Sequence, residues 1–150
     1  MFSGSYSARF DSSGRIKIPE KFRADLEESF GKDIFITSLT NEAVQIYPWP
    51  VWEKLTCITT QGLLHLKPNL RRFKLQVNRK GSRNIIDSKG RILISQDLRD
   101  KAQLDELVEI VGLDDHFEVW NKDMLDQMLD ENPLTDSDFE TIANLAEKDE

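Results

Sequence analysis

Two short segments of this sequence combine an aspartate, a glycine and an arginine at the same spacing. They run from Asp11 to Arg15 and from Asp87 to Arg91, and both read Asp-Ser-x-Gly-Arg. An aspartate can bond its own backbone in a turn and glycine tolerates a positive φ, so each segment predicts a tight turn with the arginine at its exit. A guanidinium is planar and carries five N–H donors, which suits phosphates and the edge of guanine. These residues therefore favour recognition of nucleic acid.

The residues expected to form the turns are Asp11, Gly14, Asp87 and Gly90. Arg15 is the residue expected to contact a base, because its fork can bond guanine O6 and N7 together. The other cations near the turns are expected to fix the register of the protein on phosphates. The full set of candidate DNA-binding residues is Arg15, Lys17, Arg9, Lys21, Arg91 and Lys89.

The two turns differ in the residues around them. In the first, Arg15 and Lys17 are two positions apart and project to the same side of a strand. In the second, Arg91 stands between the apolar residues Ile85 and Leu93. We therefore expect the first turn to face DNA and the second to serve more in packing or subunit contacts.

Catalysis finds little support in the sequence. The two histidines, His65 and His116, are far apart and have no metal-ligand spacing around them, and no Gly-rich phosphate loop occurs. The single cysteine, Cys57, lies in an apolar stretch and is expected to be a buried thiol. We therefore expect no enzyme, no metal site, no cofactor and no small-molecule substrate.

The charge of the chain is unevenly distributed. The net charge is −7, yet residues 1–100 carry 17 Lys and Arg against 11 Asp and Glu, and residues 101–150 carry 3 against 16. Phosphate binding depends on local positive surface, so the overall charge does not exclude DNA. No apolar run approaches the roughly 20 residues that cross a bilayer, and the N-terminal residues lack the pattern of a signal peptide. We expect a cytoplasmic protein without membrane contact.

The two turns belong to a longer internal repeat with an offset of 76 residues. DSSGRIKIPEKFR at 11–23 matches DSKGRILISQDLR at 87–99, and residues 34–48 match 108–121 more loosely. Each copy predicts two strands, a short helix, two strands and a helix. A unit of about 50 residues holds too little core to be stable alone. We therefore expect the copies to pair about a pseudo-twofold axis and share one core.

Several residues have expected structural roles. Pro19 is expected to start a helix that runs to about Glu28, and Ser95 to cap the equivalent helix. Arg23 and Arg99 are expected to form salt bridges or interface contacts. The residues expected in the core or at subunit interfaces are Trp49, Trp52 and Trp120.

The chain divides into four predicted segments. These are a first repeat at 1–58, a basic helical connector at 59–82, a second repeat at 83–129 and an acidic C-terminal tail at 130–150. The connector helix is expected to end near Gly81. The tail is expected to be a solvated extension with a short helix around Phe139–Leu145.

These segments resemble the MraZ family over roughly residues 1–129, from MFSGSY through the two Asp-Ser-x-Gly-Arg segments to VGLDDHFEVWNKDML. The resemblance implies an α+β fold, a double swapped-hairpin, AbrB-like β-barrel made of two internal repeats with short flanking helices. It also implies ring-shaped, octamer-like homo-oligomers. The resemblance further implies that such rings bind short repeated boxes in double-stranded DNA upstream of the cell-division and cell-wall gene cluster.

We therefore expect a sequence-specific, DNA-binding transcriptional regulator that is cytoplasmic and associated with the nucleoid. The alternative is a protein-interaction module of the antitoxin type whose DNA binding is secondary, since related swapped-hairpin proteins include antitoxins. Binding to repeated boxes at several salt concentrations separates the two, because phosphate contacts make affinity fall steeply with salt.

Overall fold

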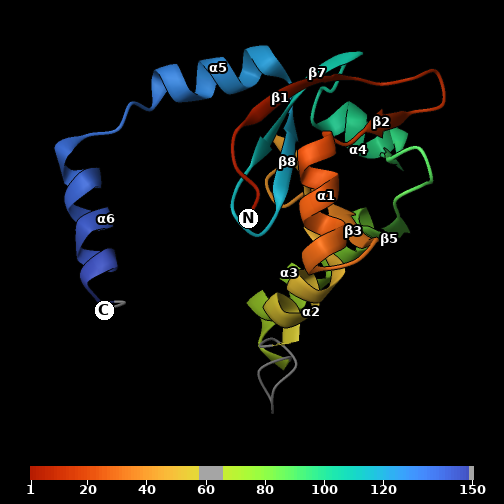
Figure 1. Cartoon of the computed structure of the whole chain (residues 1–150). Helices are drawn as coiled ribbons and strands as arrows, with labels where there is room; N and C mark the ends of the chain where they lie inside the picture. Colours follow the sequence, from red (N-terminus) through yellow and green to blue (C-terminus); the bar gives the residue numbers. More distant parts are fainter. Residues whose placement is uncertain (58–65, 149–150) are drawn as a thin grey trace.

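A computed structural model describes residues 1–57 and 66–148 (Figure 1). Its main sheet is antiparallel, with the strand order β1 (Ser5–Arg9), β7 (Leu107–Gly112), β8 (Phe117–Trp120), β4 (Ala43–Pro48), β3 (Asp33–Thr37) and β5 (Ser82–Ile85). A separate ribbon pairs β2 (Arg15–Lys17) with β6 (Arg91–Leu93). The helices are α1 (Glu20–Ser29), α2 (Trp49–Cys57), α3 (Pro68–Lys80), α4 (Gln96–Lys101), α5 (Lys122–Glu131) and α6 (Asp136–Lys148).

The two repeats exchange their first strands. Strand β1 of the first repeat pairs with β7 of the second, and β5 of the second pairs with β3 of the first. The exchange is symmetric, because Arg9 lies opposite Leu107 just as Ile85 lies opposite Asp33. Neither repeat can therefore complete its part of the sheet alone.

The pseudo-twofold axis passes through two strand pairs. In the ribbon, the equivalent residues Ile16 and Ile92 lie directly opposite each other. In the middle of the sheet, Gln45 of β4 lies opposite its equivalent Glu118 of β8, and the Gln45 amide donates a hydrogen bond of 2.8 Å to the Glu118 carboxylate. The expected pairing of the copies about a twofold is thus confirmed.

The α+β class is confirmed, and the β-barrel of the family resemblance is not. Strands β1 and β5 stand at the two edges of the six-stranded sheet, and no sheet closes on itself within the described residues. Phe10, just before the first turn, forms an isolated antiparallel bridge with Ile16 of β2.

Both repeats contribute to one hydrophobic core. Phe22 and Leu26 of α1 and Leu98 of α4 are buried in the same cluster as Ile16 and Ile92 of the ribbon. The apolar faces of these two helices thereby pack on the sheet as part of the shared core. This shared core offsets the small size of each repeat.

A second, smaller cluster lies between the sheet and the helices α2 and α3. It consists of Phe35, Tyr47, Trp52 and Val77. Trp52 and Trp120 are buried, and Trp49 packs at the edge of this cluster. The guanidinium of Arg83 lies 4.1 Å above the Trp49 ring. The structural role expected for the tryptophans is therefore confirmed.

Several local predictions are confirmed. Pro19 immediately precedes α1, and the Ser95 hydroxyl accepts a hydrogen bond of 3.3 Å from the backbone N–H of Leu98. Helix α3 ends at Lys80, directly before Gly81. The helix starts and stops therefore follow from local sequence signals.

Two predictions need correction. Cys57 is exposed rather than buried. It is the last residue of α2, and at about 100° per residue its side chain points well away from that of buried Trp52, five positions earlier. In the acidic tail, α6 spans Asp136–Lys148, nearly twice the length of the short helix expected there. His65 and the beginning of the connector lie outside the described residues.

Across residues 1–57 and 66–148, no helix combines the length and the apolar character needed to cross a membrane.

Candidate nucleic-acid interface

The carboxylate of Asp11 holds the first turn. Its Oδ1 accepts hydrogen bonds from the Ser13 hydroxyl at 2.6 Å, the Ser13 backbone N–H at 2.9 Å and the Arg15 backbone N–H at 3.0 Å. The bond from the Ser13 hydroxyl is the largest cause of a fall in the pKa of Asp11 to about 2. Gly14 has a φ of 82°, which a residue with a side chain rarely adopts. Asp11 thus stays ionised at neutral pH and shapes the turn that precedes Arg15.

The second turn repeats this arrangement. The Asp87 Oδ1 accepts bonds from the backbone N–H of Lys89 at 2.9 Å and of Arg91 at 2.8 Å. The hydrogen bond from the Arg91 backbone is the main reason that the pKa of Asp87 is lowered. Gly90 has a φ of 77°. The aspartate and glycine positions therefore have the same geometry in both repeats.

The two turns lie side by side because they interlock. The backbone N–H of Ile18 donates to the carbonyl of Gly90 at 2.9 Å, and that of Ile94 donates to the carbonyl of Gly14 at 3.2 Å. The glycine of each turn thus accepts a hydrogen bond from the segment that follows the other turn. The turns form one rigid surface rather than two independent loops.

The ribbon between the turns has a buried face and an outward face. Ile16 and Ile92 form its central pair and are buried. Side chains alternate along a strand, so the residues on either side of this pair face outward. They are Arg15 opposite Leu93, and Lys17 opposite Arg91. This face presents three cations and one leucine that is 43% exposed.

An arginine on the helix of each repeat packs against the turn of the other repeat, a contact that we call the clasp. Arg23 of α1 donates to the Ser88 carbonyl at 3.3 Å, and a Cβ added to Gly90 would lie 2.9 Å from its guanidinium. Arg99 of α4 lies equally close to the first turn, 2.7 Å from a Cβ added to Gly14. The glycines therefore make room for these arginines as well as supplying the positive φ.

The clasp was not visible in the sequence. Arg23 forms the expected salt bridge with Glu27, at 3.3 Å. Its contact with the second turn joins residues of different repeats, which no local pattern reveals. The signal that could have found it is the recurrence of this arginine at the repeat offset in both copies.

The two turn arginines have different surroundings. The Arg91 guanidinium contacts two carboxylates, Asp87 at 3.0 Å and Asp11 at 3.1 Å. Arg15 donates to the Ser13 hydroxyl at 3.1 Å, and its guanidinium has no carboxylate within 4.0 Å among the described residues. Arg15 therefore retains more capacity to bind an external anion or base than Arg91.

The remaining candidate cations stand around the ribbon. Arg9 is paired with Glu106 at 2.9 Å, and Lys17 lies 4.0 Å from Glu20. All four of these side chains are more than half exposed, so the pairs are easily exchanged for phosphate contacts. Lys21 and Lys89 are exposed as well.

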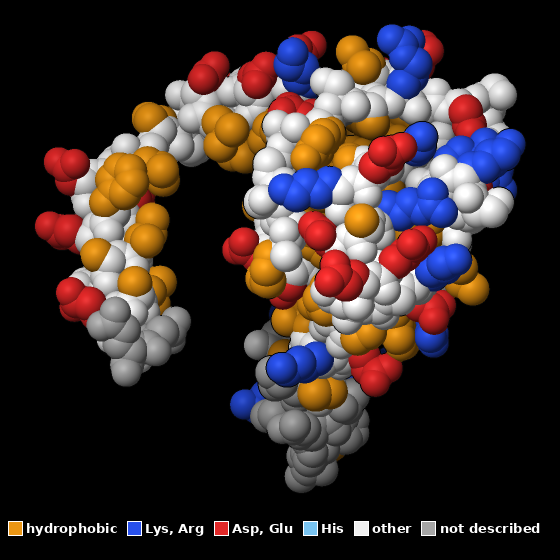
Figure 2. Space-filling model, in the orientation of Figure 1, with side chains coloured by type: hydrophobic (Ala, Val, Ile, Leu, Met, Phe, Trp, Pro, Cys, Tyr) orange, Lys and Arg blue, Asp and Glu red, His pale blue; other side chains and the backbone are white. Residues whose placement is uncertain are grey.

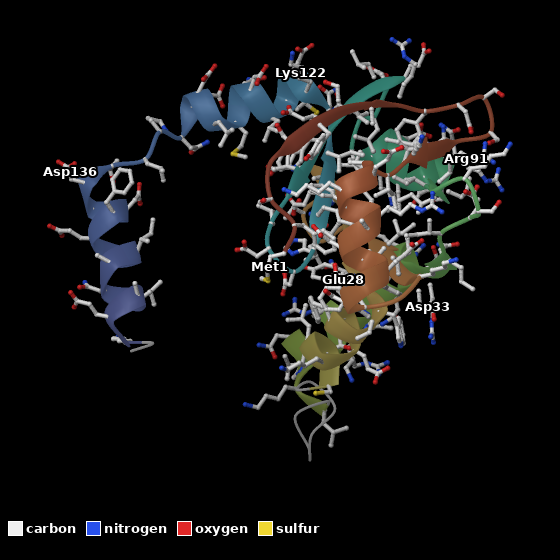
Figure 3. The ribbon with its side chains drawn as sticks, viewed as in Figure 1. Met1, Glu28, Asp33, Arg91, Lys122 and Asp136 are labelled. Carbon is white, nitrogen blue, oxygen red and sulfur yellow. The ribbon has the colours of Figure 1, made fainter. Side chains whose placement is uncertain are left out.

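Lys and Arg side chains gather on the side of the molecule that carries β2 (Figure 2). Arg91 lies at the same end, among other nitrogen-bearing side chains (Figure 3). The acidic helices α5 and α6 extend from the opposite side (Figure 1). The basic first part of the sequence and its acidic C-terminal part thus lie on opposite sides of the molecule.

His116, the histidine within the described residues, packs against an aromatic ring and a carboxylate. The His116 ring stacks on Tyr47 with 4.4 Å between the centroids, and its Nδ1 lies 2.8 Å from an Asp115 oxygen. Burial is the main reason that the pKa of Tyr47 rises to about 12. Throughout the described part of the chain, no three His, Cys, Asp or Glu side chains are grouped so as to hold a metal ion.

Comparison with known proteins identifies relatives over most of the chain. A family described as "MraZ protein, putative antitoxin-like" matches residues 1–59 and 82–145. The "Transcriptional regulator MraZ" of Acidobacterium capsulatum is 34% identical over 143 residues, which cover 95% of this chain and 97% of the relative. The proteins of the same name from Nitrosomonas europaea and Leuconostoc citreum are 36% and 39% identical, covering 87% and 81% of both chains respectively.

The two matched segments contain the whole of the interlocked ribbon and both clasping arginines. Helix α3 lies between them, outside the match. On this evidence the chain belongs to the MraZ family.

Proposed function

We propose that this chain is a sequence-specific, DNA-binding transcriptional regulator whose ribbon of β2 and β6 enters the major groove. The observation that carries the proposal is the outward face of this ribbon, where Arg15, Lys17 and Arg91 stand together on a rigid pair of turns. A two-stranded ribbon fits the major groove, and a preorganised arginine fork can read guanine there. The names of the relatives support the regulatory role.

In this proposal Arg15 reads a base, while Arg9, Lys17, Lys21 and Lys89 contact phosphates. Arg91 acts mainly by fixing the two turns, since both of its neighbouring carboxylates already engage it. The first turn therefore contributes more of the specificity than the second.

The proposal includes the assembly and the target that the family resemblance implies. A ring-shaped homo-oligomer repeats the ribbon at fixed spacing, so that docking of one ribbon raises the effective concentration of the next. This favours short direct repeats over a single box, in a promoter of the cell-division and cell-wall gene cluster. The strand exchange of β1 and β5 supports a swapped-hairpin, AbrB-like arrangement of the repeats at 1–58 and 83–129.

Arg15→Ala tests the proposed base contact. A bidentate arginine–guanine pair contributes about 1–3 kcal/mol of discrimination, so we expect the preference for box DNA over unrelated DNA to fall by roughly 5- to 150-fold. Arg72→Ala is the matched control, because Arg72 is exposed on α3, outside the ribbon. Fluorescence anisotropy at several salt concentrations measures both. An unchanged preference in Arg15→Ala would rule out this residue as the reader.

The family description favours a second function, an antitoxin-like interaction module. In that case a basic or toxin-like protein is the main ligand and DNA binding is secondary. Co-expression with candidate toxin proteins, followed by purification of the complex, distinguishes the two. A complex that Arg15→Ala leaves intact, together with weak and salt-insensitive DNA binding, supports the interaction module.

A further inference from the structure

One residue on the outward face of the ribbon differs in chemistry from the other three. Leu93 of β6 is 43% exposed, and it shares this face with Arg15, Lys17 and Arg91. A single exposed leucine is common on protein surfaces and has no meaning by itself. The position of Leu93 gives it one, because it lies directly opposite Arg15, the residue proposed to read a base.

The strand register places the side chains of Leu93 and Arg15 next to each other. The backbone N–H of Ile94 donates to the carbonyl of Gly14 at 3.2 Å, so these two residues form a hydrogen-bonded pair. Bonded and non-bonded pairs alternate along an antiparallel ladder, and the next pair, Arg15 and Leu93, is therefore non-bonded. In such a pair the Cα atoms lie about 4.5 Å apart and the side chains approach closely. A partner that Arg15 reaches therefore also meets Leu93.

The two halves of the ribbon differ although the pseudo-twofold relates them. Lys17 is the residue equivalent to Leu93, at the repeat offset of 76 positions. One half therefore combines Leu93 with Arg15, and the other combines Lys17 with Arg91. The apolar residue accompanies the arginine that has no carboxylate partner among the described residues, and the lysine accompanies the arginine that two carboxylates engage.

The base edges in the major groove carry one kind of apolar group. Adenine, guanine and cytosine present ring nitrogen, carbonyl or amino groups there, whereas thymine presents a C5-methyl group beside its O4. A leucine held against a hydrogen-bonding edge displaces water without replacing its hydrogen bonds, which is unfavourable. A leucine held against the methyl group buries apolar surface on both partners. The base that suits Leu93 is therefore thymine.

We propose that Leu93 contacts the C5-methyl group of a thymine at a base pair next to the guanine that Arg15 reads. Base pairs follow one another at about 3.4 Å along the duplex, which is close to the spacing of about 4.5 Å across a non-bonded pair. One ribbon thus reads two neighbouring base pairs, one by hydrogen bonds and one by apolar contact. The inference rests on the proposed function, since it requires the ribbon to enter the major groove.

Contact with a protein subunit suits Leu93 less well. The centre of a protein–protein interface is depleted of charged residues, whereas the outward neighbours of Leu93 are Arg15, Lys17 and Arg91. A protein partner would have to neutralise these cations with its own carboxylates. The phosphates on both sides of a groove supply that charge without further requirements. The surroundings of Leu93 therefore favour DNA.

Replacing thymine by deoxyuridine tests the DNA side and leaves the protein unaltered. Deoxyuridine lacks the C5-methyl group and keeps the O4 acceptor. Each thymine of a duplex with one box is replaced in turn, and fluorescence anisotropy measures the affinity of the wild-type chain. Loss of one buried methyl group should weaken binding roughly fourfold at a thymine next to a guanine. A box in which every replacement is harmless overturns the inference.

Leu93→Ala tests the protein side. It removes the methyl groups that would touch the base, so this variant should bind the thymine and deoxyuridine boxes with equal affinity. Leu75→Ala is the matched control, because Leu75 is a leucine on α3, outside the ribbon, and is 55% exposed. It should keep the roughly fourfold difference of the wild-type chain. A difference that persists in Leu93→Ala contradicts the contact.

Leu93→Lys gives the second strand the residue that the first strand carries at Lys17. This variant should lose the sensitivity to the thymine methyl group, and a new phosphate contact should steepen the dependence of affinity on salt by about one unit of slope. Light scattering should give the same mass for this variant, Leu93→Ala and the wild-type chain. A change of mass with an unchanged ratio of thymine to deoxyuridine affinity would make Leu93 a subunit contact and overturn the inference.

The outcomes separate this inference from the proposed function. If the chain prefers its box and the preference depends on Arg15, but no thymine methyl group affects affinity, the regulator stands and the role of Leu93 is wrong. If the chain prefers no DNA sequence over any other, the proposed function and the role of Leu93 are both wrong.

Discussion

Arg15 and Arg91 occupy equivalent positions but carry different charge balances. The Arg91 guanidinium sits between the carboxylates of Asp11 and Asp87. The Arg15 guanidinium donates a hydrogen bond to the Ser13 hydroxyl and pairs with no carboxylate among the described residues. A side chain that neutralises two carboxylates stabilises the fold, and a side chain without such partners is available to a ligand. The two copies of the motif thus place their arginines in different surroundings.

Replacing these arginines should separate stability from binding. Arg91→Ala leaves two carboxylates facing each other across the turns, and since its side chain is 34% exposed we expect a loss of about 1 kcal/mol in the free energy of unfolding. Arg15→Ala should lower the free energy of unfolding by less than half of this amount. It should also reduce the preference for box DNA over unrelated DNA. Urea denaturation followed by tryptophan fluorescence measures the stabilities. A larger loss in Arg15→Ala than in Arg91→Ala would reverse the assignment.

The carboxylate of Asp11 should make stability depend on pH in the acid range. Its pKa is about 2 in the folded chain against about 3.8 when unfolded, so its contribution is complete above pH 4 and is lost as the pH falls towards 2. Asp11→Asn lacks the charge at every pH. We expect the wild-type chain to be more stable than Asp11→Asn at neutral pH and the two to converge near pH 2. Parallel melting curves with a constant difference down to pH 2 would count against this role.

At the scale of elements, the clasp between helix and turn depends on glycine. Gly14 combines a positive φ with a guanidinium 2.7 Å from the position of an added Cβ, whereas Gly31 has a φ of 94° and nothing within 4 Å. Replacing Gly31 would therefore cause backbone strain alone, whereas replacing Gly14 would cause backbone strain and a steric conflict with Arg99. Because a guanidinium is the end of a flexible side chain, the conflict at Gly14 is resolved by moving Arg99 rather than the backbone.

Gly14→Ala should consequently cost more than Gly31→Ala. The left-handed backbone alone costs about 1–2 kcal/mol for a residue with a side chain, and this term is common to both. In an Arg99→Ala background, the cost of Gly14→Ala should fall to that of Gly31→Ala, which a double-mutant cycle of unfolding free energies measures. Equal costs for Gly14→Ala with and without Arg99 would show that the clasp contributes nothing.

The local elements and the pairing of the two repeats could be predicted from the sequence, and the individual contacts between elements could not. Pro19 and Ser95 mark helix starts, because these signals act within one turn of the helix. The partner of β1 is β7, about a hundred residues away, and nothing in the strand itself selects it. The same limit applies to Arg23, whose partner turn lies in the other repeat.

One local prediction was wrong and another was too short, both for physical reasons. The apolar neighbours of Cys57 suggested burial, but the buried face of α2 is set by Trp52 and the helix turns Cys57 away from it. The tail has the expected exposed helix, but the cap formed by Thr135 and Asp138 starts it earlier and it extends over 13 residues. For the candidate site, the cations beside each turn could be predicted from the sequence. That the two turns interlock is visible only in the structure.

At the scale of the whole molecule, the exchange of strands makes the two repeats one folding unit. The ribbon, the paired strands β4 and β8 and the exchanged edges β1 and β5 all cross from one repeat to the other. The core cluster draws side chains from both repeats as well. The main core is therefore shared by both repeats, and only the smaller cluster of Phe35, Tyr47, Trp52 and Val77 lies outside it.

The two repeats should therefore unfold in one cooperative transition. A chain of this size whose main core is shared by both repeats is expected to be two-state, so calorimetric and van't Hoff enthalpies should agree for the body of the protein. A fragment of residues 1–57 should remain unfolded by circular dichroism, because β1 and β3 lack their partners β7 and β5 and exposed edges cannot be stable alone. Mixing this fragment with residues 66–148 should restore the sheet, since the exchanged strands then find each other. Two separate transitions in the intact chain, or a folded 1–57 fragment, would mean that the exchange is secondary to a core within each repeat.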